Sequence, residues 1–136
     1  MFERFHDGFY NGLVISDQSV DVFVATGDRE RFVVSATGVV ALFSGELRSG
    51  NIIFDVELRT ADEIGLSEIR EVYAVASDHQ HDPWVESALA KSRSQQLSLL
   101  EINPSYGGNC LVLAKSFHVH TETEWTTRFS ERRTNA

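Results

Sequence analysis

Four of the five histidines in the chain form two His-x-His pairs, His79 with His81 and His118 with His120. On a strand, residues i and i+2 project from the same face, so His118 and His120 can offer two imidazole nitrogens to one metal ion. Glu122 continues this face and can supply a carboxylate oxygen. The other pair lies between two aspartates, which can orient metal-binding rings. These five residues form one candidate site for a divalent metal; the alternative is ordinary surface histidines.

Other reactive side chains have simpler explanations. Asp7 follows His6 and can fix a histidine tautomer, but adjacent residues rarely face each other, and Asp before Gly is typical of a turn. Cys110 begins an apolar run with no base nearby in sequence, which favours a small buried side chain over a nucleophile. The sequence motifs of nucleotide-binding loops, zinc ribbons and hydrolase elbows are absent. No catalytic residue is predicted, and the pattern leans away from an enzyme.

Residues 51–60 show the clearest two-residue alternation in the chain. The alternating apolar set is Ile52, Phe54, Val56 and Leu58. A strand with one face on a core and the other in water has this pattern. We therefore expect the apolar set to point into the core and the polar residues between them to face solvent.

Shorter alternating runs predict further strands before this one. Segments 13–15, 20–25 and 31–36 are separated by polar turns, which indicates an antiparallel meander. Segment 38–50 mixes β-branched residues with glycines. It is expected to be a loop with a short helical or strand piece.

The second half of the chain predicts two helices and a hairpin. One helix is expected around 67–73, and another begins at Asp82 and Pro83, a strong N-cap and first-turn pair. Residues 97–102 and 110–119 are expected to form the hairpin. Because both of its faces are apolar, it should lie centrally and be covered on both sides.

Together these elements predict an α+β fold. The expected architecture is an antiparallel sheet of about six strands, a meander plus a C-terminal hairpin, with one or two helices packed on one face. The 136 residues should form a single domain, with residues after about 121 as a flexible tail.

Composition narrows the class of protein. Hydrophobic residues make up 42% and charged residues 24%, as in ordinary globular domains. The apolar runs are far shorter than a membrane span, so no membrane partner is expected. The lone cysteine and the missing secretory signal favour a cytoplasmic protein. The net charge of −8 argues against nucleic-acid binding and fits either simple solubility or an acidic face that meets a basic partner.

Three blocks carry a resemblance: FHDGF at 5–9, GNIIFDVEL at 50–58 and LLEINPSYGGNCLVLAKS at 99–116. They resemble a set of small bacterial proteins of uncharacterised function that share these blocks in this order. The likeness spans most of residues 5–119 and implies no known activity. In size, acidity and the early FHDG, the chain is also similar to some immunity proteins that neutralise bacterial toxins.

These observations favour a non-enzymatic binding protein, an immunity-type inhibitor whose acidic face meets a basic toxin. Acidic pairs such as Glu68 and Glu71 are candidates for that face. Two alternatives stay open. One is a metal-binding protein or metal-dependent enzyme that uses the paired histidines. The other is a structural homodimer joined through an exposed sheet edge.

Overall fold

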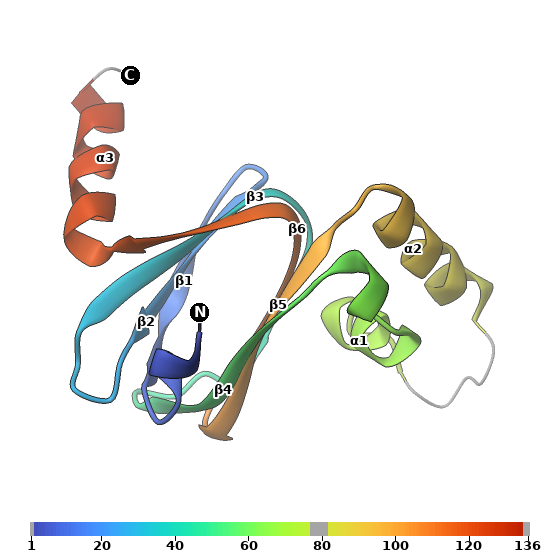
Figure 1. Ribbon diagram of the computed structural model, residues 1–136, viewed down its shortest axis with the longest axis horizontal. Helices are drawn as coiled ribbons and strands as arrows, with labels where there is room; N and C mark the ends of the chain where they lie inside the picture. Colours follow the sequence, from blue (N-terminus) through green and yellow to red (C-terminus); the bar gives the residue numbers. More distant parts are fainter. Residues whose placement is uncertain (1, 77–81, 135–136) are drawn as a thin grey trace.

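A computed structural model describes residues 2–76 and 82–134. Within this part of the chain, six strands form a closed antiparallel barrel in the order β1-β2-β3-β6-β5-β4 (Figure 1). The strands are β1 (Phe9–Ser16), β2 (Ser19–Ala25), β3 (Arg31–Gly45), β4 (Asn51–Arg59), β5 (Ser98–Tyr106) and β6 (Asn109–Thr121). The α-helices are α1 (Leu66–Val72), α2 (Pro83–Ser94) and α3 (Glu122–Thr134), and the short 3-10 turns are η1 (Glu3–Phe5) and η2 (Ala61–Glu63).

Apolar side chains fill the interior of the barrel. Every strand contributes to this core, which includes Tyr10, Val22, Val34, Ile53, Leu100, Ile102, Val112 and Ala114. The ring of Phe5, from η1, is fully buried and meets the ring of Phe32 at a centroid distance of 5.6 Å. Since a barrel of about eight strands is only just wide enough for its own side chains, six strands enclose a packed core.

A second apolar cluster lies outside the barrel, between β5–β6 and the helices α1 and α2. Leu99 and Leu113 face outward here and pack with Ile69, Val85 and Leu89 from the helices. The hairpin of β5 and β6 therefore has the barrel core on one side and this cluster on the other. The predicted coverage of this hairpin on both faces is confirmed, although a closed barrel has no central strands.

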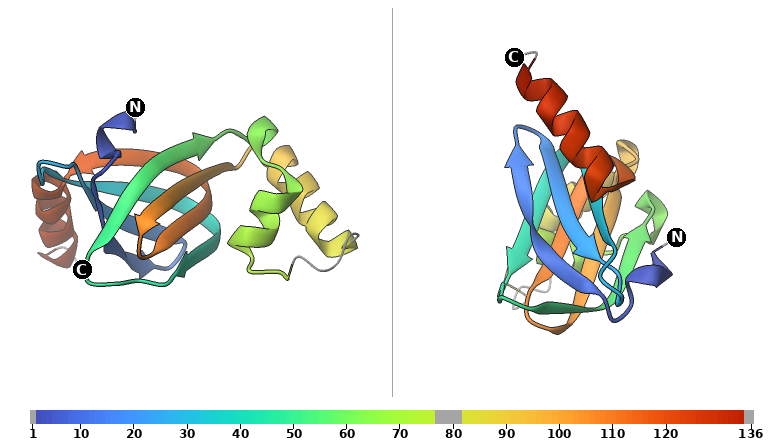
Figure 2. Two further views of the ribbon diagram at one scale, coloured as in Figure 1. Left: turned by 90° about the horizontal axis from the view of Figure 1, so that it is seen from below. Right: turned by 90° about the vertical axis from the view of Figure 1, so that its left-hand side faces the viewer.

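The expected arrangement of sheet and helices needs correction. The protein is α+β with six antiparallel strands, as predicted, but the sheet closes on itself, and the helices do not share one face of an open sheet. Helices α1 and α2 lie at one end of the molecule and α3 at the other (Figures 1 and 2). The segment expected to be a tail forms α3, where Trp125 meets Phe23 edge-to-face at 5.0 Å.

The orientation predicted for β4 is wrong in its first half. Ile53 is fully buried in the barrel, whereas Ile52 and Phe54 are exposed. Pairing with β5 shifts on both sides of Ile53, so a bulge interrupts the simple alternation. After the bulge, Val56 packs against the core, and Leu58 is 37% exposed.

Two other local predictions have clear outcomes. The segment 38–50, expected to be a loop with a short helical or strand piece, continues β3 as far as Gly45 and pairs with β6 on both sides of a bulge at 39–41. The predicted start of the second helix is confirmed, because the Asp82 carboxylate accepts a hydrogen bond of 2.9 Å from the Trp84 amide.

The barrel closes along a short seam between β1 and β4. The two strands pair only at Phe9–Ile52 and Tyr10–Asn51. Asn51 is buried, and its amide nitrogen donates to the carbonyl of Tyr10 at 3.1 Å. Its side-chain oxygen accepts from the amides of Arg48 and Gly108, at 2.8 and 2.7 Å. One side chain therefore ties three segments together at the seam.

Candidate functional site

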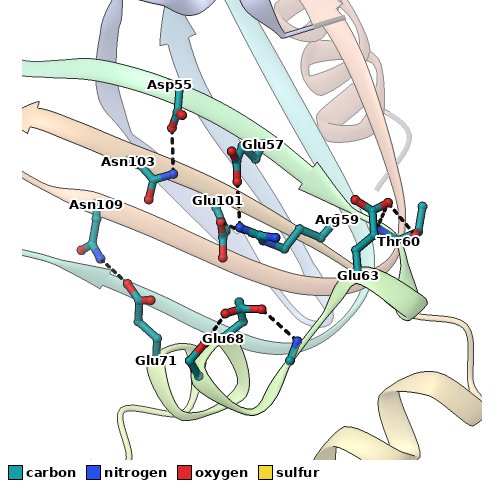
Figure 3. A network of polar contacts seen from close by, with 12 residues as sticks. Asp55, Glu57, Arg59, Thr60, Glu63, Glu68, Glu71, Glu101, Asn103 and Asn109 are labelled. Atoms are coloured by element: carbon teal, nitrogen blue, oxygen red, sulfur yellow. Dashed lines mark hydrogen bonds and ion pairs between the residues drawn. The ribbon is translucent and has the colours of Figure 1, made fainter.

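Acidic side chains gather on the outer surface where β4, β5 and α1 meet. We call this surface the acidic face; its residues are Asp55, Glu57, Glu63, Glu68, Glu71 and Glu101 (Figure 3). Arg59 lies among them and projects from β4 toward Glu57 and Glu101. The topology brings these residues together because β4 and β5 are neighbours and α1 follows β4 after a short turn.

Arg59 is the centre of the acidic face. Its terminal nitrogen lies 2.9 Å from a carboxylate oxygen of Glu57, and its Nε lies 3.1 Å from Glu101. The Nε contact is an ion pair without a well-aligned hydrogen bond. Glu101 is only 6% exposed, whereas Glu57 stands in solvent. A buried carboxylate needs such a partner, since an unpaired charge at this depth is very costly.

The local field at this centre is negative. Burial raises the pKa of Glu101; Arg59 opposes this, and the nearby Glu68 and Glu57 carboxylates raise the pKa further. Burial lowers the pKa of Arg59, but Glu101, Glu57 and Glu68 outweigh it, and the net shift is upward. Three carboxylates thus act on one guanidinium and leave an excess of negative charge.

Neutral groups hold the remaining acids in place. Glu68 accepts a hydrogen bond of 2.8 Å from the Gly65 amide at the start of α1, and Asp55 accepts one of 2.8 Å from Asn103. Glu71 lies 3.5 Å from the amide nitrogen of Asn109. None of these contacts cancels a charge, so the carboxylates present a fixed negative surface.

A groove of about 690 Å³ borders this surface, between the N-terminal turn and residues 55–58 of β4. His6 lines it and donates from Nδ1 to the carbonyl of Phe54. Its Nε2 lies 3.7 Å from the carboxylate of Asp7, and both side chains are exposed. This geometry joins η1 to β4.

The histidine pair on β6 stands apart from the acidic face. The ring centroids of His118 and His120 lie 6.4 Å apart. On the neighbouring strand β3, these residues pair with Ser35 and Val33, respectively. The Nδ1 of His120 lies 3.4 Å from Arg128 of α3. Burial lowers the pKa of His120, and Arg128 lowers it further, although Glu124 acts in the opposite direction.

The carboxylate predicted to bind a metal together with these histidines lies beside an arginine. Glu122 begins α3 and lies 3.7 Å from the Nε of Arg31. His79 and His81 lie outside the described residues. Within residues 2–76 and 82–134, no three His, Cys, Asp or Glu side chains are grouped to hold a metal ion. The metal site stays a prediction, to be decided by elemental analysis of the wild type and of His118→Ala/His120→Ala.

Cys110 is fully buried in the barrel core beside Tyr10. Burial raises the pKa of its thiol to about 12, against the opposing influence of the Tyr10 hydroxyl. The Tyr10 hydroxyl itself is engaged with Ser44 at 2.7 Å. A thiol in this environment stays protonated and inaccessible, which agrees with the packing role expected from the sequence.

The pairing of Arg59 with Glu101 was missed by the sequence analysis. A signal for it exists, because Glu101 interrupts the apolar run of residues 97–102. A charged residue in a strand covered on both faces needs a partner from a neighbouring strand. The identity of that partner depends on the register of β4 against β5, which the sequence pattern does not supply.

No protein-family model, curated protein or solved structure matches this chain. None of the helices in the described part of the chain is long and apolar enough to cross a membrane.

Proposed function

We propose that this protein is a non-enzymatic binding protein whose acidic face meets a basic protein partner. The observation that carries the proposal is the group around Arg59, where Glu57, Glu68 and Glu101 outnumber a single guanidinium. Negative potential of this kind accelerates encounter with a positively charged surface and disfavours acidic partners. The resemblance to immunity proteins supports a basic toxin as that partner and inhibition as the outcome.

The packed barrel also supports recognition at the outer surface. Its interior is filled by buried side chains such as Val22, Leu100 and Val112, which favours recognition at the outer surface over a ligand inside the barrel. The acidic face, in contrast, is built on the hydrogen-bonded strands β4 and β5, on η2 and on the short helix α1. A surface held in this way loses little conformational entropy when it binds.

The test is a capture experiment with the full chain immobilised at low salt and exposed to a bacterial lysate. The variant Glu68→Gln/Glu71→Gln removes two charges of the acidic face and keeps one side-chain oxygen at each position to accept a hydrogen bond. The matched control, Asp17→Asn/Glu131→Gln, removes two exposed charges elsewhere. We expect the wild type and the control to retain a basic protein, identified by mass spectrometry.

Kinetics with the captured protein then test the role of charge. The acidic-face variant should associate about tenfold more slowly at low salt, with a weaker salt dependence and a nearly unchanged dissociation rate. Equal rates for the variant and the control would contradict the proposal, as would the absence of any basic protein among those retained.

A further inference from the structure

The outer edge of β4 is open over the second half of the strand. β4 pairs with β5 as far as Arg59, whereas its pairs with β1 end at Ile52. Beyond that point β1 and β4 diverge (Figure 1). We call residues 55–59 the open edge.

The N-terminal turn covers β4 only up to the point where the open edge begins. The Asp7 amide donates to the carbonyl of Ile53 at 3.0 Å, and the Ile53 amide donates to Gly8 at 2.9 Å. His6 then bonds the carbonyl of Phe54. No described segment bonds to the backbone of the open edge on this side. Alternate amides and carbonyls of the edge are therefore available to an added strand.

The surface beside the open edge is shaped for an extended chain. The groove of about 690 Å³ follows residues 55–58 and is bounded by Phe2, Glu3 and His6. Leu58 in this groove is 37% exposed, and Phe54 on the same strand is 55% exposed. Free backbone groups next to apolar side chains are the two features that strand addition uses for affinity and for specificity.

The negative charge beside the open edge determines which kind of added strand is favoured. Asp55 and Glu57 belong both to the open edge and to the acidic face, with the buried Glu101 behind them on β5. A second copy that added antiparallel through the same edge would bring the Glu57 carboxylates of both copies together, and Arg59, the cation of this edge, is already paired with Glu57 and Glu101. An extended segment rich in lysine or arginine is attracted instead.

We propose that the open edge of β4 accepts an extended basic segment of a protein partner as an added strand. The segment alternates apolar residues, which enter the groove, with Lys or Arg residues, which meet Asp55 and Glu57. This inference rests on the proposed function, because it names the part of the basic partner that the acidic face recognises.

The probe is a library of random octapeptides displayed on phage and selected on the full chain. We expect enrichment of peptides that alternate β-branched or aromatic residues with Lys or Arg. A synthetic enriched peptide is then titrated by fluorescence polarisation. Methylation of alternate backbone amides of the peptide should weaken binding about tenfold, because strand addition needs those donors. On saturation with the peptide, amides within the open edge should become protected from hydrogen exchange.

A pair of protein variants localises the binding. Leu58→Lys places a positive charge on the open edge and should weaken binding of the peptide about tenfold. Ile15→Lys makes the same change at an exposed position of the β1–β2 hairpin and should leave binding within about twofold. Circular dichroism checks that both variants fold, and the methylated peptide provides a test that needs no protein variant.

Several results would overturn the inference: no enrichment, enriched peptides without basic residues, or equal binding by the two variants. A dimer that Leu58→Lys dissolves in light scattering would assign the edge to a second copy. The proposed function can fail separately. If the captured basic protein is lost from Glu68→Gln/Glu71→Gln but kept by Leu58→Lys, the acidic face binds it without strand addition. If peptides bind the edge but no basic protein is captured, only the proposed function falls.

Discussion

Glu101 shows how burial and pairing compete at a single residue. Its side chain lies in the acidic face on the outer side of β5, almost fully buried, and Arg59 forms an ion pair with it (Figure 3). Because burial is the largest influence on its pKa, the ion pair only partly offsets the loss of water. Such a pair contributes more to the position of side chains than to stability.

The sign of this effect gives a pH prediction. A raised folded-state pKa means that the folded protein holds the proton to a higher pH than the unfolded chain. Ionisation of Glu101 therefore costs stability as pH rises from about 4.5, its ordinary value, through the raised pKa. Glu101→Gln lacks this cost, so its free energy of unfolding should rise relative to wild type across that window. Urea unfolding at a series of pH values measures the difference; a difference that falls with pH would contradict it.

Cys110 gives a second prediction at the residue scale. The folded thiol ionises only near pH 12, whereas the ordinary value is 9.0. Iodoacetamide at pH 8 should therefore modify Cys110 quickly in urea and very slowly in the native protein, as mass spectrometry can measure. The same shift predicts that stability falls as pH rises above 9, because the unfolded chain then loses a proton that the fold retains. Native labelling at the unfolded rate would show that the thiol is accessible.

At the scale of elements, the sequence predicts strands better than their orientation. Alternation located β4 within a residue, yet Ile53 points into the barrel where Ile52 and Phe54 were expected. Ile52, Ile53 and Phe54 are all apolar, so hydrophobicity alone does not show which of them faces the core. A shift of one residue along the strand turns every side chain to the opposite face of the sheet. The deciding contacts come from the bulge opposite β5 and from the N-terminal turn, which are distant in sequence.

The length of β3 was missed for a related reason. Gly45 and Gly50 are expected to interrupt this segment, and β3 does end at Gly45; before that the strand continues past Gly38, whose positive φ of 65° lies next to the bulge. A glycine that permits a bulge and a glycine that ends a strand look the same in sequence. Pairing with β6, which runs along the whole of β3, decides between the two outcomes.

The side chain of Asn51 holds strands and turns together, which gives a prediction about stability. Its side chain satisfies Tyr10, Arg48 and Gly108 at the point where β1, β4 and the β5–β6 turn meet. Asn51→Ala leaves buried backbone groups without partners and should lower the free energy of unfolding by roughly 2–4 kcal/mol. Asn11→Ala, at an exposed position of β1, is the control and should cost far less. Urea denaturation compares the two; similar losses would show that the Asn51 contacts contribute little.

At the scale of the whole molecule, the fold separates stability from recognition. The core and the outer cluster under α1 and α2 use the apolar residues, while the acidic face spans the outer side of β4 and β5 and the exposed side of α1 (Figure 3). The sequence indicated an acidic surface through its net charge of −8. It named Glu68 and Glu71 as candidates for that surface but not the residues of β4 and β5 beside them, because their neighbourhood depends on the pairing of β4 with β5.

Closure of the barrel depends on how closely the chain approaches itself at Gly8. A Cβ atom there would lie 2.1 Å from the carbonyl oxygen of Ala25 and 2.9 Å from that of Phe5, both backbone atoms that cannot move aside freely. The Gly8 carbonyl also accepts from Ile53, next to the only pairs between β1 and β4. This close approach explains why a residue without a Cβ atom occupies position 8 of the FHDG segment.

Gly8→Ala should therefore weaken the seam before the rest of the barrel. We expect a loss of about 3 kcal/mol in the free energy of unfolding, the usual scale for forcing an atom into a packed site. Native-state hydrogen exchange should speed up most at Ile53, and much less in β3 and β6, which pair along their length. Gly50→Ala is the matched control, since its added Cβ meets no heavy atom within 4 Å. If both variants unfold alike, or exchange rises evenly over all strands, closure does not depend on Gly8.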